Sequence, residues 1–185
     1  MNNNESRLVP DVAETLAQPI KLLLLDVDGV MTDGRITYND AGQELKSFDI
    51  HDGLGIKLLQ RSGVQVGIVT GRSSAMVARR ASELGIDILL QGREDKWVAV
   101  QSIQQQLGLL SSEIAYMGDD LPDLSAIRHV GLGVAPANAV ALVRSHAKLV
   151  TRAAGGAGAV REACEFILAA QGKLIAAQHD YLGQA

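Results

Sequence analysis

The sequence predicts an α/β fold in which helices cover both faces of an open parallel sheet. Short apolar runs alternate with helical patterns along most of the chain. Glycines stand where three of the helices should stop, at Gly63, Gly85 and Gly108. The first apolar run, residues 21–27, is apolar nearly throughout, which is typical of a strand in the middle of such a sheet.

The predicted elements alternate in chain order. Strands are expected at 21–27, 65–69, 87–90, 113–117, 131–134 and 148–150. Helices are expected at 54–61, 73–84, 96–107, 122–127, 138–144 and 157–170. Ser73, Ser74 and Asp95 are of the types that cap helix N-termini, so they mark two of the starts.

One segment, "GRITYNDAGQELKSF", interrupts this alternation. Two strand-like pieces flank the turn-rich residues Asn39 to Gly42, which predicts a β-hairpin that projects from the first strand-to-helix connection. The segment is too short to be a domain. We therefore expect a single domain at 19–171 with a hairpin insertion at about 34–48, a polar and loose N-terminal extension at 1–18, and a C-terminal tail at 172–185.

Composition restricts the possible partners. A net charge of -4 and 3% aromatic residues argue against nucleic acid, and no apolar run is long enough to span a membrane. The lone Cys164 cannot form an internal disulfide, which suits a reducing compartment. The opening residues lack the basic start and apolar core of a signal peptide, so a cytoplasmic location is expected.

Polar residues cluster where the predicted strands end. Ligands bind beyond the carboxyl ends of the strands in open α/β sheets, so these residues should meet at one edge. They are Asp26 and Asp28 after the first strand, Thr70, Gly71 and Arg72 after the second, Lys96 after the third, and Asp119, Asp120 and Asp123 after the fourth. Each residue alone is better explained as a cap or turn residue, whereas the whole set is hard to explain in this way.

Two carboxylates two residues apart on a strand point to one face and repel each other. A hard cation would hold Asp26, the Asp28 region and Asp119 together, and Mg²⁺ prefers such oxygen ligands, although Mn²⁺ and Co²⁺ accept similar ones. A calcium loop of the EF-hand type fails on spacing, because Val30 and Met31 stand at its fifth and sixth positions. The histidines show no paired ligand spacing, which argues against zinc.

This constellation suits phosphomonoester hydrolysis. Asp26, ionised at neutral pH, can attack phosphorus directly, and Asp28 can protonate the leaving alkoxide and later accept a proton from water. Thr70 and Lys96 would bind the phosphoryl oxygens. We expect Asp120 and Asp123 to orient the metal shell and the lysine rather than react.

The motifs "DVDGV", "TGR", Lys96 and "GDDLPD", in this order between about residues 21 and 133, closely resemble the four motifs of the haloacid dehalogenase (HAD) superfamily of phosphatases. The resemblance implies a Rossmann-like core, Asp26 as nucleophile and Asp28 as acid and base. It also implies phosphate contacts at Thr70, Gly71 and Lys96. The metal would be bound by Asp26, the main-chain carbonyl of Asp28, and Asp119.

A further resemblance covers most of the chain, through "DGVMTDG", the hairpin, "FDIHDGLGIKLL", "AGGAGAVRE" and "AQGKL". These stretches are similar to the HAD subfamily that hydrolyses 3-deoxy-D-manno-octulosonate 8-phosphate (KDO 8-phosphate) in lipopolysaccharide synthesis. The intervals between motifs leave no room for a cap domain. The resemblance implies a homotetramer in which hairpins and C-terminal tails make subunit contacts.

Substrate contacts are predicted from charge and position. A sugar acid phosphate needs cations beyond Lys96, and Lys57, Arg72 and Arg80 lie on or near this edge, although solvated roles remain open. Asp52 and Gly53, at an expected helix start, could contact sugar hydroxyls or cap the helix. The glycine-rich 154–160 is expected to be a flexible helix lead-in, with an anion site or a subunit contact left open.

Three other functions remain open at this point: a phosphatase for sialic-type sugar acid 9-phosphates, a capless protein phosphatase, and a non-catalytic oligomerisation module. Asp26, Asp28, Lys96 and Asp119 argue against the last, since a scaffold has no need of clustered carboxylates. The sequence leaves undetermined the exact sugar, the turnover, the working metal and the tail residues that reach a neighbouring site.

Overall fold

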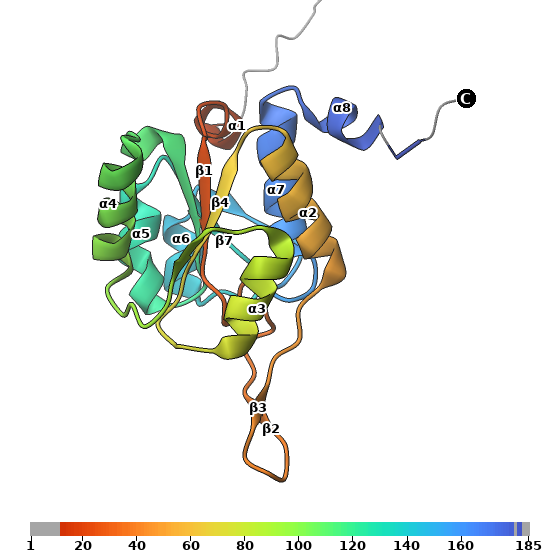
Figure 1. Cartoon of the computed structure of the whole chain (residues 1–185). Coiled ribbons are helices and arrows are strands. Elements are labelled where there is room, and N and C mark those ends of the chain that lie inside the picture. The colour runs from red at the N-terminus through yellow and green to blue at the C-terminus, as the bar shows by residue number, and fades with distance from the viewer. Residues whose placement is uncertain (1–11, 180, 183–185) are drawn as a thin grey trace, which may run out of the picture.

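The computed structural model describes residues 12–179 and 181–182. Its centre is a six-stranded parallel sheet in the order β5-β4-β1-β6-β7-β8 (Figure 1). The strands are β1 Leu22–Leu25, β4 Gln65–Val69, β5 Ile88–Leu90, β6 Ile114–Met117, β7 Leu132–Ala135 and β8 Leu149–Val150. The predicted open parallel sheet is confirmed, and β1 lies in its interior with all four residues buried.

Helices cover both faces of the sheet, as the sequence predicts. Side chains of α1 Val12–Ala17, α2 Ile50–Arg61, α3 Ala75–Leu84 and α7 Ala159–Ala170 share one core with the strands. Side chains of α4 Lys96–Leu107, α5 Leu124–His129 and α6 Ala141–His146 build a second core on the opposite face. Two short 3-10 helices, Ser111–Glu113 and Leu121–Asp123, precede β6 and α5. The sheet therefore lies between two packed layers of helices, and the loops at its carboxyl ends start from this fixed base.

Helix boundaries follow local capping chemistry. Asp95 accepts a hydrogen bond from the N–H of Val98 and starts α4, while Gly85 and Gly108 end α3 and α4 in the left-handed conformation. Helix α2 begins at Ile50, four residues before the predicted start at 54, because Asp49 caps it by accepting from the N–H of His51. Asp52 and Gly53 therefore lie inside the helix rather than at its cap.

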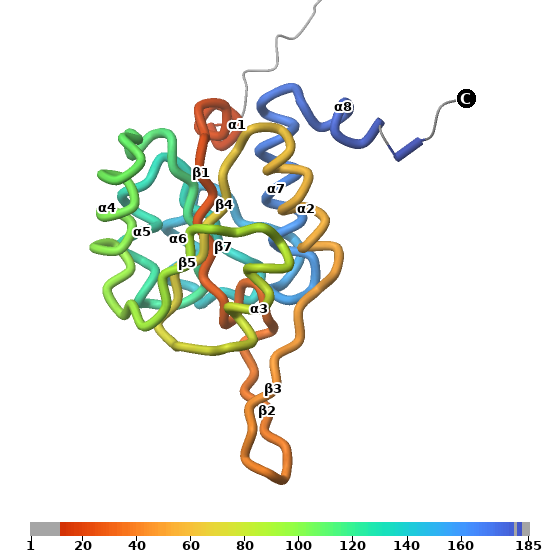
Figure 2. Tube along the Cα trace, in the orientation of Figure 1, coloured from red at the N-terminus to blue at the C-terminus, as the bar shows by residue number. Residues whose placement is uncertain are grey.

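The predicted hairpin is present and projects beyond the carboxyl ends of the strands (Figures 1 and 2). Strands β2 Thr37–Tyr38 and β3 Glu44–Leu45 pair antiparallel. The Asn39 side chain shapes the turn by accepting from the N–H groups of Ala41 and Gln43. Among the described residues this hairpin is the whole insertion between β1 and α2, so no cap domain follows the first motif.

Helices α1 and α8 lie at the end of the molecule opposite the hairpin (Figure 1). Helix α1, inside the segment expected to be loose, buries Ala13 and Ala17, so that expectation is wrong for residues 12–17, whereas 1–11 lie outside the described residues. Helix α8 Leu174–His179 buries none of its described residues. None of the described helices is long and apolar enough to cross a membrane.

Candidate active site

A cavity of about 500 Å³ lies at the carboxyl ends of β1, β4 and β6. Most of the sequence-predicted site residues line it. The lining consists of Asp26, Asp28, Gly34, Thr70, Gly71, Arg72, Glu94, Lys96, Asp119, Asp120, Pro122 and Asp123. Parallel strand topology thus brings together side chains that the sequence keeps up to about a hundred residues apart.

Asp26 directly follows β1, and its backbone N–H donates to the carbonyl of Met117 at 3.0 Å. The Nζ of Lys96, at the first position of α4, donates to Asp26 Oδ1 at 2.7 Å and to the carbonyl of Val69 at 2.9 Å. The side chains of Lys96 and Asp26 are 3% and 13% exposed. Asp26 is therefore a nearly buried carboxylate held by a buried ammonium.

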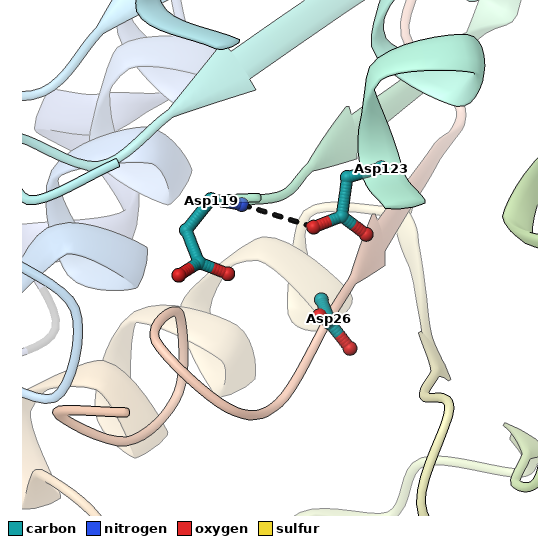
Figure 3. A group of neighbouring side chains, drawn as sticks. All are labelled: Asp26, Asp119 and Asp123. Carbon is teal, nitrogen blue, oxygen red and sulfur yellow. Dashed lines mark hydrogen bonds between the residues drawn. The ribbon is translucent and has the colours of Figure 1, made fainter. Parts of the chain in front are cut away.

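Asp26, Asp119 and Asp123 form an acidic cluster, with one carboxylate oxygen from each within 4.8 Å of the others (Figure 3). Asp123 already uses both of its oxygens. Oδ1 accepts from the hydroxyl of Tyr116 at 2.7 Å, and Oδ2 accepts from the N–H groups of Asp119 and Asp120 at 3.1 and 3.3 Å. Asp123 thus supports the cluster, which leaves Asp119, and Asp26 beside its contact with Lys96, as the carboxylates that could bind a cation.

The acidic cluster carries unfavourable negative charge. Burial, and next the charge of Asp123, raise the pKa of Asp26 to about 6, although the nearby Lys96 lowers it. Burial, followed by the charges of Asp123 and Asp26, raises the pKa of Asp119 to about 7. A hard divalent cation would relieve this repulsion, and the carboxylate donors fit Mg²⁺.

The loop after β1 approaches Asp119 so closely that its glycine is required. Gly29 has a φ of +81°, and a Cβ there would lie 2.0 Å from Asp119 Oδ2. Gly155 packs on the other side, where a Cβ would lie 1.9 Å from the Gly29 carbonyl oxygen, and the Gly156 N–H donates to the Val30 carbonyl at 3.0 Å. The glycine-rich segment therefore provides close backbone packing behind the site.

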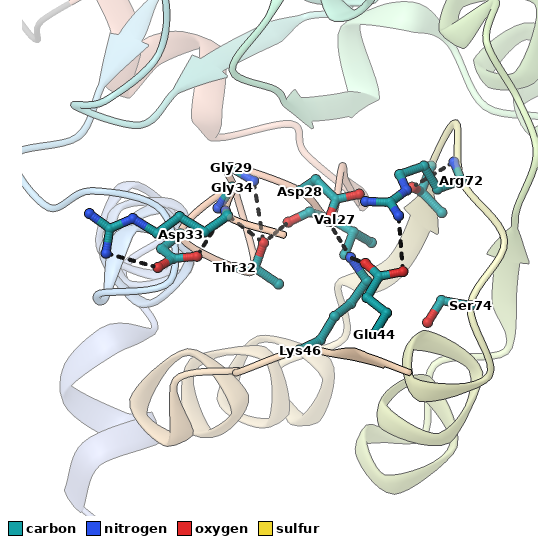
Figure 4. A network of polar contacts seen from close by, with 12 residues as sticks. Val27, Asp28, Gly29, Thr32, Asp33, Gly34, Glu44, Lys46, Arg72 and Ser74 are labelled. Carbon is teal, nitrogen blue, oxygen red and sulfur yellow. Dashed lines mark hydrogen bonds and ion pairs between the residues drawn. The ribbon is translucent and has the colours of Figure 1, made fainter. Parts of the chain in front are cut away.

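Asp28 faces a different set of partners, supplied by the hairpin (Figure 4). Its Oδ1 accepts from Nζ of Lys46, which also lies 3.1 Å from Glu44 Oε1, while Arg72 Nη2 donates to Glu44 Oε2 at 2.9 Å. The expectation that Asp26 and Asp28 share one face of a strand is wrong, because β1 ends at Leu25. We call Asp28, Lys46, Glu44 and Arg72 the hairpin network.

Sequence reasoning missed Lys46 and Glu44. Their spacing in "ELK" carried a usable signal, since residues two apart on a strand point to the same face. Two opposite charges on one face of a short hairpin strand indicate a shared polar contact. Their contact with Asp28 and Arg72 depends on how the hairpin lies against the sheet.

Thr70 and Gly71 line the cavity beside Lys96, as expected of phosphate contacts. Thr70 is 2% exposed, and its Oγ1 accepts from the N–H of Arg72 at 3.4 Å. Asp120 lines the cavity too, but its Oδ1 caps the following 3-10 helix by accepting from the N–H of Leu121 at 2.8 Å. Thr70 and Gly71 therefore remain candidates for phosphate contacts, and Asp120 for support of the loop.

Of the five predicted substrate contacts, Arg72 lines the cavity, whereas Asp52, Gly53, Lys57 and Arg80 lie outside its lining in the described chain. Asp52 is buried and accepts from the N–H of Arg161 at 2.7 Å in the first turn of α7, and burial raises its pKa to about 6. It therefore caps α7, which is far away in sequence but packs against α2, and it does not reach the cavity.

The other three residues have surroundings of their own. A Cβ on Gly53 would lie 2.4 Å from Arg80 Nη2, so this glycine allows close packing of α2 on α3. Arg80 stacks over Phe48 at 5.8 Å, and Lys57 is exposed.

Comparisons with known proteins point to one family. The haloacid dehalogenase-like hydrolase family matches residues 88–162. The chain is 46% identical, over 85% of its length and 84% of the relative, to 3-deoxy-D-manno-octulosonate 8-phosphate phosphatase KdsC of Escherichia coli.

Solved structures agree. The phosphatase of the same name from Moraxella catarrhalis, in complex with magnesium, phosphate and KDO, superposes with a TM-score of 0.91 at 45% identity, over 94% of this chain and 99% of that one. The cobalt-bound deoxy-D-mannose-octulosonate 8-phosphate phosphatase from Haemophilus influenzae gives a TM-score of 0.83 at 40% identity, over 86% of this chain and 93% of that one.

Proposed function

Because the chain belongs to the KDO 8-phosphate phosphatase family of haloacid dehalogenase-like hydrolases, we propose that it hydrolyses KDO 8-phosphate to KDO and inorganic phosphate. The reaction serves lipopolysaccharide synthesis. The observation that carries the proposal is the position of Asp26 in the cavity, paired with Lys96 and adjacent to Asp119. The proposed nucleophile Asp26 thus lies beside the proposed phosphate-binding cation and the proposed metal-binding carboxylate.

Asp26 is proposed as the nucleophile. Its carboxylate oxygen forms a bond to phosphorus while the bond from phosphorus to the sugar oxygen breaks, which leaves an aspartyl phosphate. The ion pair with Lys96 favours the ionised form of Asp26 that this attack requires. Lys96, with Thr70 and Gly71 of the same cavity lining, binds the phosphoryl oxygens as charge moves between them.

Asp28 is proposed as the general acid and base. It donates a proton to the departing sugar oxygen, and it then takes a proton from the water that attacks the aspartyl phosphate. Inorganic phosphate leaves and Asp26 is regenerated. Both residues line the same cavity, so one substrate position serves both steps.

The metal site is proposed at Asp26, Asp119 and the main-chain carbonyl of Asp28. When bound, Mg²⁺ supplies charge neutralisation for the phosphoryl oxygens and for the acidic cluster. Asp123 and Asp120 hold the loop that carries Asp119 in place. Co²⁺ is an alternative ion, because a related phosphatase has been solved in a cobalt-bound form, and Mn²⁺ accepts similar ligands.

We also propose a homotetramer in the cytoplasm, with the hairpin and C-terminal tail at subunit contacts. The hairpin exposes Ile36, Tyr38 and Leu45 by 54%, 61% and 51%, and two short strands cannot bury such side chains by themselves. Helix α8 lies at the end of the molecule opposite the hairpin, so this tail would meet the cavity of another copy rather than its own (Figure 1).

The test is phosphate release in Mg²⁺ from KDO 8-phosphate, a sialic-type 9-phosphate, hexose phosphates and a phosphopeptide, with EDTA as control. We expect metal-dependent turnover with strong preference for KDO 8-phosphate. Preference for the 9-phosphate or the phosphopeptide would contradict the substrate assignment. No turnover of any of them would favour the non-catalytic oligomerisation module.

A further inference from the structure

The hairpin places a buried lysine, Lys46, against Asp28, which lines the candidate site. The side chain of Lys46 is 2% exposed, although Leu45 beside it is 51% exposed. An ammonium is costly to bury unless carboxylates compensate it, and Lys46 has two, Asp28 and Glu44. The charge of Lys46 is therefore already neutralised within the chain, which leaves little attraction for an anionic substrate.

The hairpin network also connects three segments. Lys46 and Glu44 belong to the hairpin, Asp28 to the loop after β1, and Arg72 to the loop after β4 (Figure 4). Glu44 is held in turn by Arg72 at 2.9 Å, so the position of the lysine is set from both sides. The contact with Lys46 therefore restricts the orientation of the Asp28 carboxylate.

We propose that Lys46 is a positioning residue that holds the carboxyl group of Asp28 toward the leaving oxygen of the substrate. This inference rests on the proposed function. As the bond from phosphorus to the sugar oxygen breaks, the proton of Asp28 passes to that oxygen, and the resulting carboxylate stays paired with Lys46. The hairpin therefore contributes to catalysis as well as to subunit contact.

The experiment uses leaving groups that differ in their need for a proton. An alkoxide requires one, whereas p-nitrophenolate leaves without it. We would measure kcat/KM, which reports the steps up to release of the alcohol, for KDO 8-phosphate, glycerol 1-phosphate and p-nitrophenyl phosphate. The variants are Lys46→Met, Lys46→Arg for rescue, and Asp28→Asn as benchmark.

Lys21→Met is the matched control, because Lys21 is a paired lysine that precedes β1 at the far end of the sheet. For Lys46→Met we expect a loss of about tenfold to a hundredfold with both alkyl phosphates and a clearly smaller loss with the aryl phosphate. Asp28→Asn should show the same pattern. Lys46→Arg should recover part of the loss, and Lys21→Met should match the unmodified protein on all three.

Two outcomes would overturn the proposal. An equal loss on all three substrates would mean general damage to the site, and a loss confined to KDO 8-phosphate would mean a contact with the sugar acid. Thermal unfolding of each variant separates misfolding from either result. If the unmodified protein itself turned over none of the substrates, the proposed function would fail instead.

Discussion

Asp26 and Asp28 stand two residues apart in one motif, yet they belong to different parts of the molecule. Asp26 lies among carboxylates that follow the neighbouring strands β1 and β6, and it is paired with Lys96 at the start of α4. Asp28 pairs with Lys46, which comes from an insertion that projects from the sheet. The proposed nucleophile is thus held by the core of the domain, and the proposed proton donor by the hairpin.

The electrostatic surroundings differ in the same way. Around Asp26, burial comes first and the excess of negative charge second in raising the pKa of Asp26 and of Asp119, and a bound cation would relieve both effects. Around Asp28, Lys46 and Arg72 balance Asp28 and Glu44 within the protein. Within one motif, Asp26 thus lies in a cluster that could bind a cation, whereas the charge of Asp28 is balanced by the hairpin.

The largest effect is expected from Asp26→Asn, which removes the nucleophile and keeps the side-chain shape. Turnover of both alkyl and aryl phosphates should fall by more than about a thousandfold, because no aspartyl phosphate can form. Steady-state assays and an unfolding curve check the result. Substantial remaining turnover would rule out the covalent mechanism and with it the distinction between the two aspartates.

The next test compares the two buried lysines. Lys96→Met leaves Asp26 and Asp123 without their cation, which should lower the free energy of unfolding of the metal-free protein by about 3 kcal/mol. Added Mg²⁺ should recover part of this stability, because it supplies the missing positive charge.

Lys46 pairs with Asp28, which lies outside the acidic cluster. Mg²⁺ should therefore stabilise the Lys46→Met variant no more than it stabilises the unmodified protein. Denaturant titrations with and without Mg²⁺ measure both variants. If Mg²⁺ stabilised the two variants equally, the acidic cluster and the hairpin network would not be electrostatically distinct.

Metal affinity should depend on pH. The ligand carboxylates must lose their protons before they bind a cation, and the pKa of Asp119 is raised to about 7 in the metal-free protein. The dissociation constant for Mg²⁺ should therefore be about tenfold higher at pH 6 than at pH 8, as measured by calorimetry. The Lys46→Met variant should show the same pH dependence, and a pH-independent affinity would contradict the charge balance assigned to the acidic cluster.

The smallest effect concerns Asp52, a buried carboxylate outside both groups. Its pKa is raised to about 6 by burial, above the value of about 4 in an unfolded chain, so the native state binds the proton more tightly. Its contribution to stability is present below about pH 4 and is lost as the pH rises through about 6. Asp52 thus allows the effect of burial on a carboxylate to be tested at a residue to which no catalytic or metal-binding role is assigned.

Asp52→Asn keeps an acceptor for the N–H of Arg161 and removes the charge. The free energy of unfolding of the variant should exceed that of the unmodified protein by about 1 kcal/mol at pH 8, and by less at pH 4. Urea titrations at the two pH values measure this difference. A variant that is less stable at pH 8 would mean that the ionised carboxylate contributes more at the α7 terminus than its burial costs.

Signals within the amino-acid sequence are enough to define the alternation of strands and helices between about residues 21 and 170, the hairpin and the residues at the strand ends, although not α1 or α8. Apolar periodicity and capping residues are local signals, and parallel topology then brings the carboxyl ends of β1, β4 and β6 to one edge. That is why Asp26, Thr70, Lys96 and Asp119 can be grouped from the sequence alone.

Which charges meet outside that edge depends on tertiary packing. Lys46 is 18 residues from Asp28, and Arg161 is 109 residues from Asp52, so neither contact leaves a periodic trace in the sequence. Both depend on the direction in which a hairpin bends or a helix packs. Such contacts are set by the packing of whole elements, whereas a strand end is set by the residues within it.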